Sequence, residues 1–120
     1  MLGKNKILIV ESYLAGATVF ASILKRNGFS ADVAQTCKEA MQKTYTTDYA
    51  IVLIDEEIPD KELILQQLAK TKTAKIVITD FPQEAMLNGA DACLRKVIKP
   101  EEFLSVVKRY VESYPEPSKI

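Results

Sequence analysis

The 120-residue chain has no histidine and only two cysteines. Without histidine, His-based catalytic triads, histidine metal ligands and histidine acid/base pairs are excluded. Cys37 and Cys93 fall in different predicted elements. With no export signal, two reduced thiols are the expected state. Cys93 as a nucleophile would have no histidine base, so we interpret it as a buried packing residue.

The sequence also lacks an excess of charge, a long apolar run and a glycine-rich loop. Sixteen basic and sixteen acidic residues give a formal net charge of zero. This balance argues against a non-specific nucleic-acid-binding protein. The apolar runs are far too short to span a membrane, and residues 1–4 lead directly into a strand pattern, so we expect a cytoplasmic chain. Gly16 stands alone after the first apolar run, which disfavours a nucleotide-binding domain.

Length and composition predict one globular domain. Hydrophobic residues make up 48% of the chain and charged residues 27%, which is ordinary for a folded protein. We expect residues 1–120 to form a single domain with its core over about residues 5–113. Residues 114–120 contain two prolines and are expected to form a tail. The sequence does not say whether the chain is whole or excised from a longer protein.

Apolar segments predict five strands. Ala50 to Ile54 are five apolar residues in a row, which is typical of a strand buried on both faces of a parallel sheet. The β-branched content and the stop at Pro59 favour a strand over a short buried helix. The predicted strands are residues 6–10, 29–34, 50–54, 75–79 and 92–95, and Asp55 directly follows the third.

Helical periodicity predicts a helix after each strand, over residues 13–27, 37–45, 60–70, 82–88 and 100–113. Ser12 and Thr36 are the expected N-caps of the first two helices. Gly28 is expected to end the first helix, and Tyr45 is expected to point inward from the second. Strands that alternate with helices through right-handed crossovers predict an α/β fold with a doubly wound, five-stranded parallel sheet and helices on both faces.

Polar residues follow four of the five strands, where ligands bind in open α/β sheets. They are Glu11 and Ser12, Asp55, Thr79 and Asp80, and Lys96. A carboxylate can accept a phosphoryl group as a nucleophile, and a divalent cation held by neighbouring carboxylates would neutralise the developing charge. A hydroxyl and an ammonium would hold the phosphate oxygens. The alternative is that polar residues simply begin where strands end.

At these residues the chain resembles the receiver domain of two-component response regulators, over about residues 6–113. The similarity includes Asp55 four residues before Pro59, Thr79 at the end of the fourth strand, and Lys96 seven residues after Gly89. The resemblance implies a flavodoxin-like three-layer sandwich. It also implies that Asp55 is the phosphoacceptor, Thr79 the switch hydroxyl and Lys96 the lysine that holds the phosphate.

The resemblance further implies a cofactor and partners. Mg²⁺ would be bound by Asp55, the backbone carbonyl of Glu57 and an acid, either Glu11 or Asp80. The implied partners are a sensor histidine kinase or another signalling protein, and an output domain or effector protein. A homodimer stays open, whereas direct contacts with nucleic acid or a membrane are not expected. The domain is expected to act as a signalling module and not as an enzyme.

The chain also departs from the family. Ser12 stands where the family has a second metal-binding aspartate, and it is a neutral, poorer Mg²⁺ ligand. Asp80 replaces a small residue, and it would repel a phosphate, act as a substitute metal ligand or turn to solvent. Val97 replaces the proline that usually follows the lysine. These departures leave a second hypothesis open, a pseudo-receiver that serves as a phosphorylation-independent protein-interaction module.

Two further interpretations are weaker. A small α/β enzyme or cofactor carrier of flavodoxin-like architecture would need a glycine-rich loop, a histidine or a cofactor motif, and the sequence has none of these. Glu56 and Glu57 could form a pair of carboxylates for hydrolysis. Adjacent residues on an extended segment point apart, which disfavours that pairing.

Overall fold

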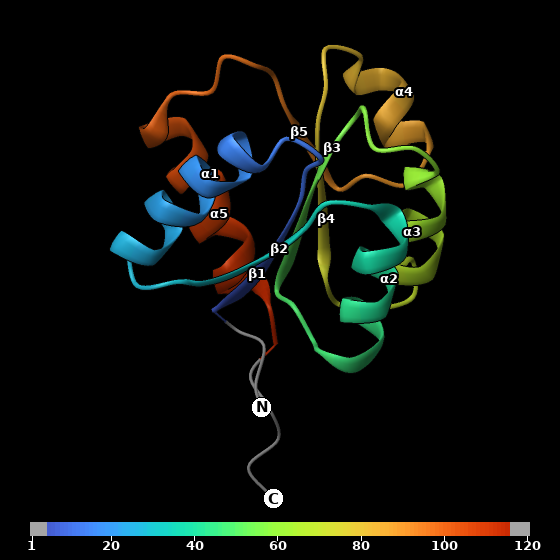
Figure 1. Ribbon diagram of the computed structural model, residues 1–120, viewed down its shortest axis with the longest axis horizontal. Helices are drawn as coiled ribbons and strands as arrows, with labels where there is room; N and C mark the ends of the chain where they lie inside the picture. Colours follow the sequence, from blue (N-terminus) through green and yellow to red (C-terminus); the bar gives the residue numbers. More distant parts are fainter. Residues whose placement is uncertain (1–4, 116–120) are drawn as a thin grey trace, which may run out of the picture.

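The computed structural model describes residues 5–115, where five strands alternate with five helices (Figure 1). The strands are β1 (Lys6–Val10), β2 (Ser30–Ala34), β3 (Ile51–Asp55), β4 (Ala74–Ile78) and β5 (Ala92–Leu94). The helices are α1 (Leu14–Arg26), α2 (Cys37–Thr46), α3 (Lys61–Leu68), α4 (Pro82–Leu87) and α5 (Pro100–Ser113). The expectations about a signal peptide and most of the tail fall on residues 1–4 and 116–120, outside the described range.

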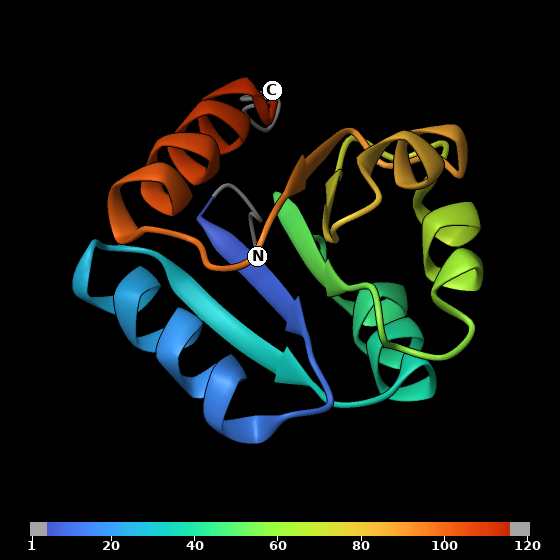
Figure 2. The same ribbon diagram turned by 90° about the horizontal axis from the view of Figure 1, so that it is seen from above.

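The five strands form one parallel sheet in the order β2-β1-β3-β4-β5, so β3 lies at its centre. Figure 2 shows α1 and α5 on one face of the sheet and α2, α3 and α4 on the other. This arrangement confirms the predicted α/β fold, a doubly wound five-stranded sheet in a flavodoxin-like three-layer sandwich. No helix within residues 5–115 is long and apolar enough to cross a membrane.

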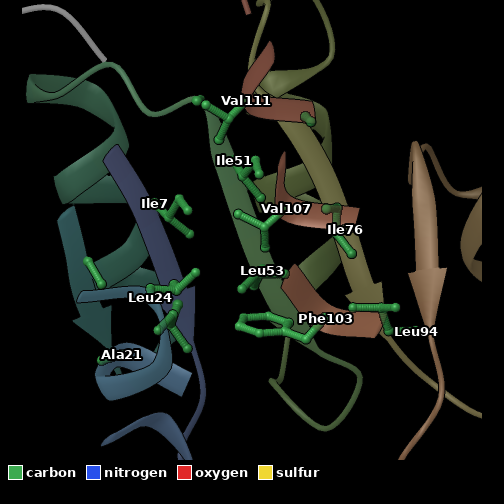
Figure 3. Packing of buried hydrophobic residues seen from close by; sticks show 14 of the residues in the cluster. Ile7, Ala21, Leu24, Ile51, Leu53, Ile76, Leu94, Phe103, Val107 and Val111 are labelled. Atoms are coloured by element: carbon green, nitrogen blue, oxygen red, sulfur yellow. The ribbon is translucent and has the colours of Figure 1, made fainter. Parts of the chain in front are cut away.

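Side chains of the central strands alternate between the two faces of the sheet, as the pleat requires. In β3, Ile51 and Leu53 pack beneath α1 and α5, whereas Val52 and Ile54 pack toward the other three helices. Figure 3 shows the first of these clusters, with Ile7, Ala21, Leu24, Ile51, Leu53, Ile76, Leu94, Phe103, Val107 and Val111 labelled. Burial of one such large side chain contributes roughly 1.5–3 kcal/mol to folding. Because both faces are covered, the strand is an uninterrupted apolar run in the sequence.

Most helix ends follow local chemistry. The Thr36 hydroxyl accepts a hydrogen bond from the Glu39 backbone N–H at 3.1 Å, which confirms it as the N-cap of α2. Gly28 follows the end of α1 with a φ of +88°, a conformation that glycine adopts without steric cost. These two positions fix where the chain leaves α1 and enters α2.

Two expectations about the helices are wrong. Ser12 does not cap α1, because the N-cap is Tyr13, which has extended backbone and no side-chain capping bond. Tyr45 does not point inward but is 86% exposed. It lies in the last turn of α2, whereas the residue of this helix that is buried against the core is Ala40, in its first turn. Helical periodicity predicts which face of a helix is turned to the core, but not which residues along that face are covered by neighbouring elements.

Candidate functional site

The carboxyl ends of four strands bring the predicted residues to one edge of the sheet. Asp55 is the last residue of β3 and pairs in register with Ile78 of β4, so Thr79 follows beside it. Val10 at the end of β1 pairs with Ile54, which brings Glu11 next to Asp55 from the other side. The topology alone therefore places one carboxylate between a second carboxylate and a hydroxyl.

Asp55 is a buried carboxylate, with the residue 1% exposed. Its Oδ1 accepts a hydrogen bond from the Glu57 backbone N–H at 2.9 Å. Its Oδ2 lies 2.7 Å from the Lys96 Nζ. Apart from this ion pair, Oδ2 has no hydrogen-bond partner among residues 5–115. A buried charge is tolerated when it is paired, so the lysine offsets the cost of burying the carboxylate.

Lys96 reaches the site from the segment that follows β5. Its side chain is 54% exposed, although its ammonium contacts the buried Asp55. The close polar contact with Asp55 raises the pKa of Lys96 most, and burial lowers it. The charges of Asp55, Glu11 and Glu57 raise the pKa further. The lysine is therefore held as a cation, at the point where a phosphoryl group on Asp55 would need one.

Glu11 lies next to Asp55 across the β1–β3 pairing. Partial burial raises the pKa of Glu11 most, and the negative charge of Asp55 raises it next. The Tyr13 backbone N–H and the Lys96 charge lower it. The negative charge of Asp55 therefore disfavours the ionised form of Glu11. A cation between the two side chains would remove that repulsion.

Thr79 is buried, but its hydroxyl bonds to residues other than Asp55. The hydroxyl donates to the Glu56 carboxylate. It accepts from the Phe81 backbone N–H at 2.9 Å. The structure thus brings Thr79 to the predicted edge of the sheet, but its hydroxyl donates its hydrogen bond to Glu56 and not to Asp55.

Glu57 and Asp80 differ in their relation to the site. Glu57 donates its backbone N–H to Asp55, and its charge contributes to the raised pKa of Lys96. Asp80 is exposed and lines a surface hollow with Arg95 beside the first turn of α4. Asp80 is not among the causes of the raised pKa of either Glu11 or Lys96. The assignment of both residues as metal ligands stays a prediction.

The residues that would hold a Mg²⁺ ion at this edge of the sheet are Glu11 and Asp55, and the ion stays a prediction. Across the part of the chain that the structure describes, no group of three His, Cys, Asp or Glu side chains could hold a metal. Mg²⁺ usually keeps several waters and binds one or two carboxylates, and Glu11 and Asp55 supply two from neighbouring strands. Ser12 is exposed, and its backbone carbonyl accepts from the Gln35 side chain at 3.2 Å.

Glu56 is the site residue that the sequence interpretation did not identify. Adjacent acids are expected to point apart, and they do, since Glu57 is exposed while Glu56 bonds to Thr79. The Glu56 backbone N–H donates to the Ile78 carbonyl at 3.0 Å, so the β3–β4 pairing continues past Asp55. That pairing holds Glu56 beside Thr79. In the sequence, the only indication of this role is that Glu56 directly follows the residue that ends the central strand.

Comparisons with known proteins find relatives at the level of sequence. No protein-family model matches the chain. The aerobic respiration control sensor protein ArcB of Escherichia coli K12 is 26% identical over 117 residues, which cover 87% of this chain and 15% of ArcB. The transcriptional regulatory protein CpxR homolog of Haemophilus influenzae is 25% identical over 122 residues, which cover 95% of this chain and 53% of that protein. The chain therefore spans about half of one of these relatives and a much smaller part of the other.

Solved structures share the fold along almost the whole chain. The CheY-like response regulator receiver domain protein from Methanospirillum hungatei has a TM-score of 0.82 and 24% sequence identity. The match covers 92% of this chain and 95% of that one. A likeness at this level of identity concerns the fold, and the site has to be argued from its own geometry.

Proposed function

Because the chain has the fold of the response-regulator receiver domains, we propose that it is a phosphorelay signalling domain in which Asp55 is the phosphoacceptor. The observation that carries this proposal is the buried Asp55 carboxylate with the Lys96 ammonium 2.7 Å from its Oδ2. The alternative interpretation is that this buried, paired carboxylate only stabilises the fold. The surface exposure of Lys96 and the neighbouring acid Glu11 favour a reaction site instead.

The proposed step is nucleophilic transfer of a phosphoryl group. An Asp55 carboxylate oxygen attacks the phosphorus of a donor and forms an O–P bond. The bond between phosphorus and the leaving atom breaks, and its electron pair stays with the leaving group, a histidine nitrogen in the case of a sensor kinase. Lys96 holds a phosphoryl oxygen by charge. A Mg²⁺ ion bound by Asp55, Glu11 and the Glu57 carbonyl would supply charge neutralisation.

The consequence of phosphorylation is a change in partner binding and not turnover of a substrate. The domain would take a phosphoryl group from a sensor histidine kinase or another signalling protein in the cytoplasm. It would then bias an equilibrium between two conformations that differ in affinity for an output domain or effector protein. The similarity to a sensor protein and to a transcriptional regulatory protein supports this place in a signalling chain.

A small-molecule phosphodonor such as acetyl phosphate, added with Mg²⁺, tests the proposal. We expect one phosphoryl group per wild-type chain by intact mass. We expect none on Asp55→Asn, and wild-type labelling on the matched Asp48→Asn, which removes an exposed acid near the opposite end of the strands. Unlabelled wild type at high donor and Mg²⁺ concentrations would overturn the proposal.

The second candidate is the pseudo-receiver, a protein-interaction module without phosphorylation. It is favoured by the Thr79 hydroxyl bonded to Glu56 and by the neutral, exposed Ser12. A Mg²⁺ titration separates the two candidates, read by NMR at the amides of Glu11 and Glu57. A phosphoacceptor domain is expected to show saturable shifts at millimolar Mg²⁺, whereas a pseudo-receiver is expected to show none.

A further inference from the structure

The hydrogen bond between Glu56 and Thr79 lies in a hollow between α3 and α4. The hollow has a volume of about 160 Å³ and is lined by acidic, basic and apolar side chains, namely Glu56, Glu57, Lys61, Leu65, Thr79 and Glu84 among others. Glu56 is half-buried there, and its backbone is tied to β4 through the Ile78 carbonyl. Its carboxylate is therefore held against Thr79 by the sheet itself.

The Thr79 hydroxyl has no proton left for a second acceptor. A hydroxyl has one O–H donor and two acceptor positions. The Phe81 backbone N–H occupies an acceptor position at 2.9 Å, and the hydroxyl proton is directed to the Glu56 carboxylate, which only accepts when ionised. A phosphoryl oxygen on Asp55 would need the same proton. The two acceptors cannot both have it.

The two phosphate-holding groups are therefore in different states. Lys96 already contacts Asp55 at 2.7 Å, so its ammonium lies at the carboxylate that would carry the phosphoryl group. Thr79 has to leave Glu56 first. Hydrogen bonds to an ionised group are stronger than neutral ones, so leaving this one has a cost.

We propose that Glu56 is a positioning residue that holds Thr79 away from Asp55 and so weakens phosphoryl binding at this site. The inference rests on the proposed function and adds a regulatory residue to it. Lys61 lines the same hollow but pairs with Glu62 at 3.5 Å, so removing Glu56 breaks no ion pair described in the structure. Glu84 shares the hollow without a hydrogen bond to Thr79, which makes it the matched control.

The experiment measures binding of trifluoroberyllate, a phosphoryl mimic, in the presence of Mg²⁺. The readout is the NMR shift of the Lys96 and Phe81 amides in wild type, Glu56→Ala and Glu84→Ala. We expect Glu56→Ala to bind about tenfold more tightly than Glu84→Ala, the size of one hydrogen bond to a charged group. Glu56→Gln should fall between wild type and Glu56→Ala, because its amide oxygen accepts without a charge. It also serves if the alanine variant does not fold.

A second arm tests whether Glu56 acts through the hydroxyl. Thr79→Val keeps the shape of the side chain and removes its hydrogen-bond donor. In the Thr79→Val background, Glu56→Ala should therefore change the affinity for trifluoroberyllate no more than Glu84→Ala does. Two outcomes would overturn the proposed role of Glu56 and leave the proposed function intact. One is equal affinity of Glu56→Ala and Glu84→Ala, and the other is an undiminished effect of Glu56→Ala in the Thr79→Val background. Tight binding by Glu56→Ala but not by wild type would support the proposed role. No Asp55-dependent binding in any variant would overturn the proposed function and this inference with it.

Discussion

Two of the lysine–aspartate ion pairs within residues 5–115 differ in which partner is buried. At the carboxyl edge of the sheet, the Asp55 side chain is 2% exposed and its partner Lys96 is 54% exposed. Near the other end of the strands, the Lys75 side chain is 8% exposed and its partner Asp91 is 40% exposed, with 3.1 Å between Nζ and Oδ2. One pair therefore buries a potential nucleophile, and the other buries a cation.

The backbone contacts of the two pairs differ as well. The Lys75 backbone N–H donates to the Asp91 Oδ2 at 2.8 Å, and the Asp91 backbone N–H donates to the Lys75 carbonyl at 2.7 Å. The Asp55 Oδ2 has the Lys96 ammonium alone. The Lys75 pair is thus part of the β4–β5 framework, while the Asp55 pair can exchange its surface cation contact for a bound group. The same two residue types are part of the β4–β5 framework in one place and form the proposed phosphoacceptor site in the other.

The largest effect is expected when Asp91 is removed. Asp91→Ala leaves the Lys75 ammonium buried without a partner and also removes an acceptor from the Lys75 N–H. Breaking a fully buried pair costs about 3–5 kcal/mol. Because Asp91 is partly exposed, we expect a loss of about 2–3 kcal/mol in the free energy of unfolding. Urea denaturation monitored by circular dichroism measures it.

Asp55→Asn is the comparison variant for that measurement. The Lys96 side chain is already more than half exposed, so its ammonium can turn to water when the Asp55 charge is lost. We expect the free energy of unfolding to change by less than about 1 kcal/mol. Equal losses of unfolding free energy in Asp91→Ala and Asp55→Asn would show that the two ion pairs contribute equally to stability, which would contradict the difference between them.

A smaller effect is expected at Glu11. Its raised pKa means that the folded state binds a proton more tightly than the unfolded state does. The stability that Glu11 contributes is therefore complete below its ordinary pKa of 4.5 and is lost as pH rises through the folded-state value. Glu11→Gln should remove this loss and make the chain more stable at pH 7 than wild type, by less than about 1 kcal/mol. Urea denaturation at pH 4 and pH 7 gives the difference.

Glu62→Gln provides a control with the opposite sign. The pKa of Glu62 is lowered, first by a hydrogen bond with its own backbone N–H and also by Lys61. Its stabilising contribution is present above the ordinary pKa and is lost as pH falls through the folded value. The two variants should therefore shift the pH dependence of stability in opposite directions. Shifts in the same direction would argue against partial burial of Glu11 beside Asp55 as the cause of its raised pKa.

The smallest effect is expected at Gly16, in the first turn of α1. A Cβ at this position would lie 3.4 Å from the Glu11 Oε1 and 3.4 Å from the Tyr13 ring. Gly16→Ala should stabilise the helix by about 0.5–1 kcal/mol, because alanine loses less backbone entropy. The Glu11 carboxylate lies at the end of a flexible side chain and can shift by the few tenths of an ångström required. Thermal unfolding measures the gain, and a lower melting temperature would show that Glu11 cannot shift.

The parts of the fold that depend on strong local patterns are predictable from the sequence. The bounds of β1 and α5 match the expectation, because an apolar run and a 3.6-residue period each specify an element without help from the rest of the chain. The convergence of Asp55 and Lys96 also follows, since parallel strands bring their carboxyl ends to one edge. The expectation for Tyr45 is wrong because helical periodicity does not show which residues of a face meet the core, and Tyr45 is exposed.

The side-chain partners within the site could not be predicted without the pairing of β3 with β4. Nothing in the local sequence distinguishes Glu56 from Glu57, and either could have faced Thr79. The β3–β4 pairing beyond Asp55 decides that it is Glu56. The exposed position of Asp80 likewise depends on how the segment after β4 turns toward α4. Spacing along the chain identifies which residues reach the edge of the sheet, and side-chain packing determines their partners.

The three-residue strand β5, at the edge of the sheet, has a consequence for the site beyond it. Asp55 ends the central strand, whose amides should exchange with solvent hydrogen only when the whole domain unfolds. Lys96 follows a strand that pairs with β4 alone, so its surroundings should open at a lower free energy. We expect each such opening to detach the lysine and to leave the buried carboxylate without its counter-ion while the core stays folded.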